Sequence, residues 1–314
     1  MLKLVEHMLQ ELKLVAPGTA VQYYINITSG ESLAISAFVD GKARGGRFVQ
    51  IKASEYLNLA AQYASYSSAW NDYGAFVPQP LGYREVEGWS IMVSAGAEHT
   101  MAHPRRVLSS GHKGASSLSR YLLDFFGQSA ALSNTRCGNA ELLHELQEFF
   151  APTPLANTAA RCVAQAQAHG LAGLCEIPQH GDFVFNNLVW SHGKLVIFDW
   201  EDYRKVFLPG LDIWTLVMSM LEQEIDALRA VVEPGEQPDA QMESFLEQAC
   251  TLQGLNLVQF RGLVPLYLLV FLHLKRNYGI EVQERISNIL MQLAPPAAPM
   301  QRHSATRSAE ALHP

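Results

Sequence analysis

The sequence predicts an α+β protein with two lobes, a small antiparallel β-rich lobe followed by a larger, mostly helical one. Segments rich in β-branched and aromatic residues fill the chain up to residue 93, and apolar repeats at spacings of three and four dominate after residue 96. The short stretch Ser94-Ala95-Gly96 separates them. We expect an N-terminal lobe over residues 1–93, a C-terminal lobe over 94–294 and, from its small, polar and Pro-rich residues, a disordered tail over 295–314.

The N-terminal lobe is expected to begin with a helix and to continue as strands. Leu2, Val5, Leu9 and Leu12 fall at helical spacing. Glu6 and His7 interrupt this apolar pattern, so we interpret it as an amphipathic helix rather than a secretory signal. The elements expected next are strands over 21–27, 33–39 and 47–52, a hairpin turn over 28–32, a helix over 54–70 and a strand pair over 81–86 and 89–93.

The C-terminal lobe is expected to be built from helices, interrupted by short strands between residues 180 and 212. The helices are predicted over 117–126, 140–149, 156–168, 213–230, 240–252, 257–276 and 283–293. One apolar run, Gly262 to Leu274, is shorter than the roughly 20 residues that span a bilayer. We therefore predict a buried core helix and no transmembrane segment.

Composition limits the possible functions. The chain has 314 residues, 48% of them hydrophobic, which favours a globular protein with a substantial core. A net charge of −7 argues against nucleic acid as a partner, because such binders need a basic face. The four cysteines, Cys137, Cys162, Cys175 and Cys250, form no metal-binding spacing, and we expect them to be reduced and mostly buried in a cytoplasmic protein. The oligomeric state stays open.

One stretch carries the chemistry. His180-Gly181-Asp182 is followed five positions later by Asn187, and an apolar run then ends at Asp199. Phosphoryl transfer from a metal-bound nucleotide needs this set of groups: one carboxylate to deprotonate an acceptor hydroxyl, and an amide oxygen and a second carboxylate to hold Mg²⁺. The catalytic loop of protein kinases has the same step of five from Asp to Asn. Asp182 is thus the predicted catalytic base, and Asn187 and Asp199 are the predicted metal ligands.

Several acidic residues of this stretch also allow a purely structural interpretation. Asp182 could be a turn residue after Gly181, and Asp199 could simply end a strand, but their common register favours the functional one. Glu201 could lie beside the site or at the surface. Asp212 could cap a helix that begins at Ile213.

The motifs HGDF, FDWE and Gly210-Leu211-Asp212 resemble those of the aminoglycoside phosphotransferase and choline kinase-like family. Its members are small-molecule kinases with a protein-kinase-like fold, and the resemblance covers residues 20 to 293. It implies that the terminal phosphate of Mg·ATP or Mg·GTP passes to a hydroxyl of a small molecule. The acceptor stays open between a sugar, an amino alcohol, an aminocyclitol and a cell-envelope precursor.

The resemblance also implies roles for residues outside the Asp-Asn-Asp set. Lys52 resembles the lysine that reaches the nucleotide phosphates, and Gly30 stands where the phosphate-covering turn is expected. Ser94 and Gly96 resemble the hinge that meets the adenine. His180 resembles the residue that braces the catalytic loop, and Asp212 matches an Asp that ties the loop to the following helix.

The chain departs from the family pattern near the predicted nucleotide site. Phe185 replaces the usual catalytic-loop proline, and no Glu stands where the helix after Lys52 should supply its partner. Gln62 is nearest to that place, and Glu55 follows Lys52 by three residues. These departures leave an alternative function, a non-catalytic pseudokinase that acts by binding. A protein kinase is disfavoured, because the segment between Asp199 and Asp212 is too short for a peptide-docking loop.

Overall fold

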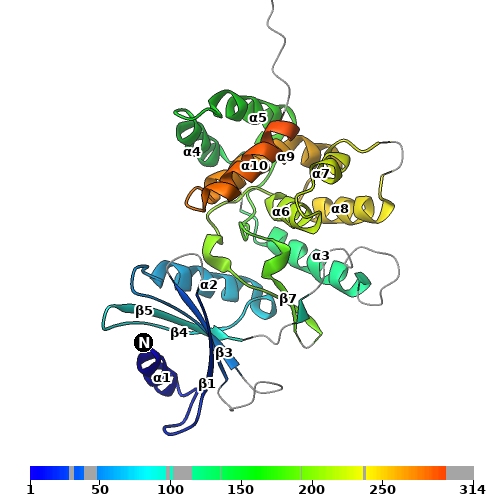
Figure 1. Ribbon diagram of the computed structural model, residues 1–314. Coiled ribbons are helices and arrows are strands. Elements are labelled where there is room, and N and C mark those ends of the chain that lie inside the picture. Colours follow the sequence, from blue (N-terminus) through cyan, green and yellow to red (C-terminus); the bar gives the residue numbers. More distant parts are fainter. Residues whose placement is uncertain are drawn as a thin grey trace, which may run out of the picture.

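The computed structural model describes residues 1–27, 32–38, 48–96, 100–101, 115–134, 136–191, 193–235 and 238–294. Figure 1 shows a β-sheet with two helices in one part of the molecule and a larger group of helices in the other. We call residues 1–95 the N-lobe and the rest of the described chain the C-lobe. Gly30 and the predicted tail lie outside the described residues.

The N-lobe is a five-stranded antiparallel sheet in the order β1-β2-β3-β5-β4. Its strands are β1 (Gln22–Ile27), β2 (Leu33–Phe38), β3 (Phe48–Ser54), β4 (Pro80–Val86) and β5 (Trp89–Ala95). Helix α1 (Leu2–Glu11) buries Val5, Met8 and Leu9 in a small apolar cluster with alternate residues of the sheet, such as Ile35 and Ile51. The predicted amphipathic helix and antiparallel sheet are both confirmed.

The third strand and the helix after it differ from the prediction at their shared boundary. Strand β3 runs on to Ser54, so Lys52 lies within the strand and not at its end. The Ser54 hydroxyl accepts hydrogen bonds from the backbone N–H of Tyr56 and Leu57, which favours a turn over a helix start. Helix α2 (Ala60–Tyr73) therefore begins later than expected.

The C-lobe contains most of the helices and a small sheet, in the order β6-β7-β8. The helices are α3 (Ala115–Ala131), α4 (Ala140–Phe150), α5 (Ala156–Ala168), α6 (Leu211–Met220), α7 (Ile225–Val232), α8 (Ala240–Leu252), α9 (Leu257–Leu274) and α10 (Ile280–Leu293). The strands are β6 (Thr100–Met101), β7 (Leu188–Ser191) and β8 (Lys194–Ile197). The single helix expected over 213–230 is wrong: Glu222 and Gln223 adopt positive φ and separate α6 from α7.

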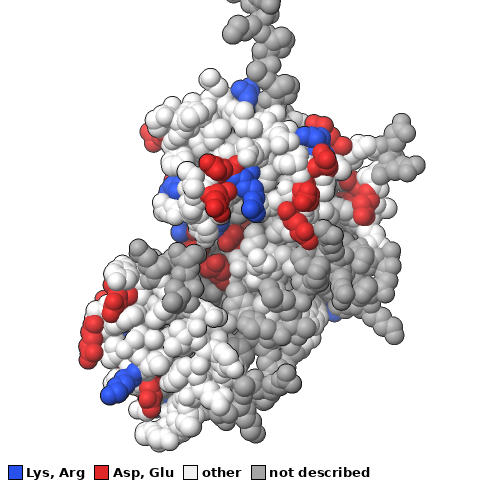
Figure 2. All heavy atoms as spheres, in the orientation of Figure 1, with Lys and Arg blue, Asp and Glu red and all other residues white. Residues whose placement is uncertain are grey.

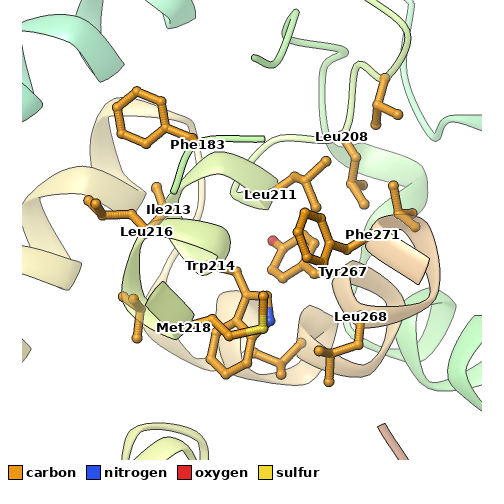
Figure 3. Packing of buried hydrophobic residues seen from close by; sticks show 14 of the residues in the cluster. Phe183, Leu208, Leu211, Ile213, Trp214, Leu216, Met218, Tyr267, Leu268 and Phe271 are labelled. Carbon is orange, nitrogen blue, oxygen red and sulfur yellow. The ribbon is translucent and has the colours of Figure 1, made fainter. Parts of the chain in front are cut away.

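The core of the C-lobe surrounds α6 and α9. Trp214 of α6 and Phe260 and Tyr267 of α9 are completely buried, and the Phe260 ring contacts both of the others. Figure 3 shows Trp214 and Tyr267 beside Leu211 and Leu268. Helix α9 is long and apolar enough to cross a membrane by length and composition, but most of it is buried inside the lobe, as predicted for a core helix. At Gly262 a Cβ atom would lie 2.2 Å from the His169 ring, so glycine allows α5 and α9 to approach closely.

The cysteines follow the prediction only in part. Cys162 and Cys250 are buried in the C-lobe, whereas Cys137 and Cys175 are exposed. The expectation that the cysteines are mostly buried is therefore wrong for this second pair, which lies on two segments joined by an isolated β-bridge outside the helical core.

Candidate active site

The segment from His180 to Asn187 forms a loop that is tied to the start of α6. The Asp212 carboxylate accepts hydrogen bonds from the backbone N–H groups of His180 and Gly181, at 2.7 and 3.0 Å. Gly210, not Asp212, occupies the N-cap of α6, and the Asp212 side chain makes no cap bond. The helix-capping interpretation of Asp212 is therefore wrong, because the carboxylate is used by the loop.

His180 connects this loop to the end of β8. Its Nε2 donates to the Phe198 carbonyl at 2.8 Å, and its Nδ1 accepts from the Asp182 backbone N–H at 3.2 Å. Since both nitrogens are used in this way, the ring is neutral. Burial lowers its pKa to about 4. The imidazole thus joins the backbone of Asp182 to the residue that precedes Asp199.

Gly181 lets the loop pass close to the segment that follows Asp199. It has a φ of +85°, and a Cβ atom here would lie 2.9 Å from Cβ of Asp202. An L-residue would meet both an unfavourable backbone conformation and a close contact. Glycine at this position therefore allows the loop that carries Asp182 to pack closely against Asp202.

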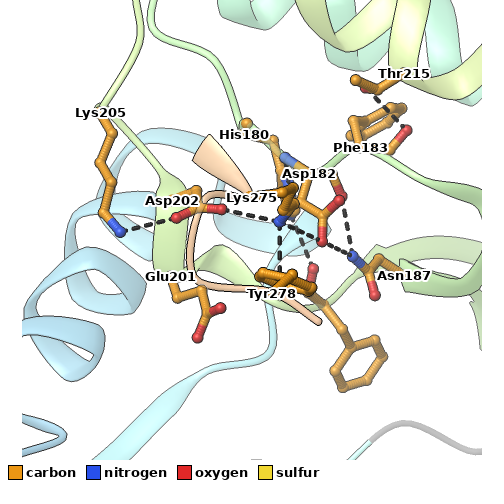
Figure 4. Close-up of polar contacts among 12 residues, drawn as sticks. His180, Asp182, Phe183, Asn187, Glu201, Asp202, Lys205, Thr215, Lys275 and Tyr278 are labelled. Atoms are coloured by element: carbon orange, nitrogen blue, oxygen red, sulfur yellow. Dashed lines mark hydrogen bonds and ion pairs between the residues drawn. The ribbon is translucent and has the colours of Figure 1, made fainter. Parts of the chain in front are cut away.

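Asp182 and Asn187 contact each other across the loop. The Asn187 Nδ2 group donates to the Asp182 carbonyl at 2.9 Å and lies 3.5 Å from its Oδ2. This leaves the Asn187 Oδ1 atom as the end of the amide that can face a cation. Burial raises the pKa of Asp182, and the Lys275 ammonium, 3.0 Å from Oδ2, opposes that rise (Figure 4).

Asp199 adopts a left-handed backbone conformation with φ of 63°, and its N–H donates to the Tyr66 hydroxyl at 2.9 Å. Non-glycine residues in this region are uncommon and concentrate at functional sites. Burial and, second, repulsion from Glu201 raise the pKa of the Asp199 carboxyl to about 6. The site therefore gathers more negative charge than the protein neutralises.

Lys52 has an acidic partner, which comes from the C-lobe. Its Nζ lies 3.3 Å from Glu201 Oε2, and both side chains are about three-quarters buried. Neither Gln62 nor Glu55 supplies the charge: Gln62 is uncharged and lines the same cavity, and Glu55 is exposed. Glu201, which the sequence left open between site and surface, thus lies in the site.

A cavity of about 610 Å³ lies between the lobes, and acidic atoms are visible in the hollow that separates them (Figure 2). This volume is typical of small-molecule sites. Its lining includes Ser36, Gln50, Lys52, Met92 and Ser94 from the sheet, Gln62 and Tyr66 from α2, and Asp199, Glu201, Asn277, Tyr278 and Gly279 from the C-lobe. Ser94 thus lines the cavity, whereas Gly96 follows the end of β5 and is not part of the lining.

The residues predicted to hold Mg²⁺ fit that ion chemically. The Asn187 amide oxygen and the Asp199 carboxylate are hard oxygen donors. Within the described chain no group of three His, Cys, Asp or Glu side chains could bind a metal alone. Mg²⁺ usually takes only one or two carboxylates together with phosphate oxygens and water, so a sparse donor set beside excess negative charge suits it.

Sequence reasoning missed Lys275 and Asp202 in this site. Lys275 follows the last turn of α9, and its Nζ also lies 3.1 Å from Asp202 Oδ2. Asp202 stands three residues after Asp199, which was a usable signal. Lys275 carries no such signal, because only the path of α9 brings it to Asp182.

Comparison with solved structures finds several of similar fold. The chain resembles the crystal structure of aminoglycoside phosphotransferase APH(4)-Ia, with a TM-score of 0.56, 15% identity and coverage of 93% of this chain and 99% of that one. The ternary complex of APH(2″)-IIa with streptomycin and ATP has a TM-score of 0.55 and 11% identity, and the match covers 92% of this chain and 95% of that one. Ethanolamine kinase from Plasmodium vivax has a TM-score of 0.57 and 10% identity, and the match covers 90% of this chain and 84% of that one. None of the curated proteins matches in sequence.

These likenesses confirm the predicted protein-kinase-like two-lobed fold. The family model described as "Phosphotransferase enzyme family" matches residues 27–239, more than half of the chain. The predicted family and the predicted class of enzyme, a small-molecule kinase, are thereby confirmed, and the chain belongs to the phosphotransferase enzyme family.

Proposed function

We propose that the chain transfers the terminal phosphate of ATP, bound with Mg²⁺, to a hydroxyl group of a small molecule. One observation carries this proposal: the Lys52–Glu201 pair and Asp199 line a cavity between the lobes, and Asp182 lies on the loop tied to the same segment. ATP is favoured over GTP as donor because the related APH(2″)-IIa structure contains ATP.

Each residue has a defined part in the reaction. Asp182 accepts the proton of the acceptor hydroxyl as the oxygen attacks the terminal phosphorus. Lys52, held by Glu201, steadies the phosphates, and Asn187 and Asp199 would hold Mg²⁺. When bound, Mg²⁺ would neutralise charge on the phosphate oxygens. His180 and Asp212 fix the loop from either side, so that Asp182 needs little reorganisation during transfer.

The acceptor proposed here is a hydroxylated small molecule such as a sugar, an amino alcohol, an aminocyclitol or a cell-envelope precursor. Structural relatives named as aminoglycoside phosphotransferases and an ethanolamine kinase support this class. The proposed location is the cytoplasm.

The pseudokinase alternative loses its main support. It drew on the absence of an acidic partner for Lys52, and Glu201 supplies that partner from the C-lobe. The proposed catalytic residues Asp182, Asn187 and Asp199 are all present.

Thermal unfolding tests the proposal without knowledge of the acceptor. Wild type and Asp199→Ala would be heated with ATP, with GTP and without nucleotide, each with and without Mg²⁺. A ligand at a hundred times its dissociation constant adds about 2.7 kcal/mol of stability. A Mg²⁺-dependent rise that the variant lacks is expected, followed by ADP release with amino sugars and amino alcohols as acceptors. Well-folded wild type that gains no stability from either nucleotide would contradict the proposal.

A further inference from the structure

Lys275 is a buried cation in direct contact with the proposed catalytic base. Only 2% of its surface is exposed. Its Nζ lies 3.0 Å from Asp182 Oδ2, 3.1 Å from Asp202 Oδ2 and 3.3 Å from the Tyr278 hydroxyl (Figure 4). The Tyr278 ring also lies 4.6 Å from Nζ, at a distance typical of a cation–π contact. A lysine is rarely buried to this extent unless it is paired, so this group of contacts holds its charge in place.

Asp202, which lies outside the catalytic loop in the sequence, also holds Lys275. Its two carboxylate oxygens are divided between two lysines: Oδ2 contacts Lys275 and Oδ1 contacts Lys205 at 2.8 Å. Burial raises the pKa of Asp202, but these two cations lower it further, so that it lies below its usual value. Asp202 is therefore a stable anion that keeps the Lys275 ammonium in one position.

The contacts on Asp182 are arranged differently. Lys275 and the amide of Asn187 both approach Oδ2. Among the described residues, no side chain makes a hydrogen bond or ion pair with Oδ1. The carboxylate is thus held by one oxygen and leaves the other for a ligand. General-base catalysis needs this arrangement, since a base that rotates freely spends less time in the productive geometry.

We propose that Lys275 is a positioning residue of the phosphotransferase reaction, holding Asp182 by Oδ2 so that Oδ1 faces the acceptor hydroxyl. This inference rests on the function proposed above. In the reaction the acceptor proton passes to Asp182 Oδ1, the acceptor oxygen bonds to the terminal phosphorus, and the bond from that phosphorus to the bridging oxygen breaks to release ADP. Lys275 neither gains nor loses a proton in this step.

Lys275 acts from outside the catalytic loop, which distinguishes it from the residues that the motif predicts. It follows α9, and Asn277, Tyr278 and Gly279, two to four residues further on, line the cavity between the lobes. The connection between α9 and α10 thus contacts both the base and the donor site, and it is a part of the chain that the motif stretch does not include.

The test compares Lys275→Met with Lys275→Arg and with Lys205→Met. The last variant is a matched control, because Lys205 contacts the same Asp202 but its side chain is 57% exposed and does not reach Asp182. ADP release from Mg·ATP would be measured with water and with a panel of sugars, amino sugars, amino alcohols, aminocyclitols and sugar-containing cell-envelope precursors. We expect Lys275→Met to lower kcat about 100-fold, within the range for general-base catalysis. The KM for ATP should change less than about threefold, since the proposed role lies in the chemical step. Lys275→Arg should retain most of the wild-type kcat, and Lys205→Met should have the same kcat as wild type.

A double-mutant cycle separates positioning from general structural support. If Lys275 acts through Asp182, then Lys275→Met should change ADP release by less than about threefold in an Asp182→Asn background. Equal fold-losses of ADP release in both backgrounds, or wild-type turnover in folded Lys275→Met, would overturn this inference and leave the proposed function intact. If wild type releases no ADP with any acceptor, the proposed function fails and this inference fails with it.

A second variant covers the case in which Lys275→Met does not fold. Asp202→Asn removes the anion that holds Lys275 but leaves its contact with Asp182. We expect kcat to fall about tenfold with the KM for ATP unchanged, as for a partial loss of the base's alignment. Folded Asp202→Asn with wild-type kcat would equally overturn the inference.

Discussion

The Lys52 ammonium of the N-lobe lies 3.3 Å from the carboxylate of Glu201 in the C-lobe, 149 residues further along the chain. In this protein the partner of the lysine therefore does not come from the helix that follows it. Glu201 stands two residues after Asp199, so one short segment supplies both the proposed metal ligand and the charge that holds Lys52. The relative position of the lobes and the integrity of the proposed nucleotide site are linked through this pair.

Replacing Glu201 by Gln should weaken the binding of Mg·ATP. The substitution keeps the shape of the side chain but removes the charge that holds Lys52 toward the cavity. We expect the dissociation constant to rise about tenfold, which corresponds to about 1.4 kcal/mol. Isothermal titration calorimetry at fixed Mg²⁺ measures it.

Glu55→Gln is the matched control for this prediction. Glu55 is close to Lys52 in sequence, but it is exposed and lies outside the cavity lining. The Glu55→Gln variant should bind Mg·ATP as tightly as wild type. Equal affinities for the Glu201 and Glu55 variants would show that the observed pair does not contribute to nucleotide binding.

The fold was largely predictable because its elements carry strong local patterns. The apolar repeats that fill 156–168 and 240–252 predict two helices with the bounds that the structure shows. The separation of α6 from α7 was not predictable in this way. There the N–H of Gln223 bonds to the carbonyl of Met218, a helix ending that usually uses glycine, but Glu222 and Gln223 adopt the positive φ values instead.

The site was predictable where its residues are close in sequence and not where tertiary packing brings them together. His180, Asp182, Asn187 and Asp199 share one stretch with fixed spacing. Glu201 is in the same stretch, but its role depends on how β3 approaches it. Lys275 depends on the whole course of α9, and a lone lysine after an apolar helix is usually solvated.

Asp182→Asn should separate nucleotide binding from turnover. Asn keeps the shape of the side chain but cannot accept the acceptor proton as a carboxylate does. We expect ADP release to fall at least about 100-fold, while stabilisation by Mg·ATP stays close to the wild-type value. Asp226→Asn, the same change at an exposed carboxylate of α7, is the control and should leave both quantities unchanged. Comparable turnover in the Asp182 variant would rule out its role as base.

His180 should make the stability of the protein depend on pH below neutrality. Its pKa in the folded protein is lowered to about 4 from an ordinary value of 6.5. Between these values the unfolded chain binds a proton that the folded protein does not, so stability falls as pH decreases from 6.5 to 4. The loss of unfolding free energy caused by His180 reaches about 3 kcal/mol near pH 4, and there is no such loss above pH 7.

His180→Gln should remove this part of the pH dependence. Chemical denaturation at several pH values between 4 and 7.5 measures the free energy of unfolding for both proteins. We expect the variant to be less stable at pH 7.5, since it loses the bonds of the ring, but to show a smaller decrease toward pH 4. His144→Gln, at an exposed position of α4, is the control. A His180 variant whose curve runs parallel to wild type would show that His180 does not cause the acid sensitivity.

Cys137 and Cys175 should form a disulfide under mild oxidation. They face each other across an antiparallel bridge, with their sulfur atoms 3.6 Å apart. The flanking bonds, Gly138 N–H to the Leu174 carbonyl and Glu176 N–H to the Arg136 carbonyl, mark this as a pair that exchanges no backbone bonds. Such pairs have Cα atoms about 4.5 Å apart, within the range that a disulfide spans.

Oxidised glutathione is the reagent for this prediction, since two thiols reduce it to two molecules of glutathione as the bond forms. The disulfide would close a loop of about 40 residues and should stabilise the protein by about 4 kcal/mol in a manner reversed by dithiothreitol. Peptide mass spectrometry should find the peptides of Cys137 and Cys175 joined, and thermal unfolding should show a higher Tm. Cys137→Ser should abolish the rise, whereas Cys162→Ser, at a buried position, should retain it. If four thiols remain titratable after oxidation and denaturation, the two segments do not approach each other in solution as the bridge indicates.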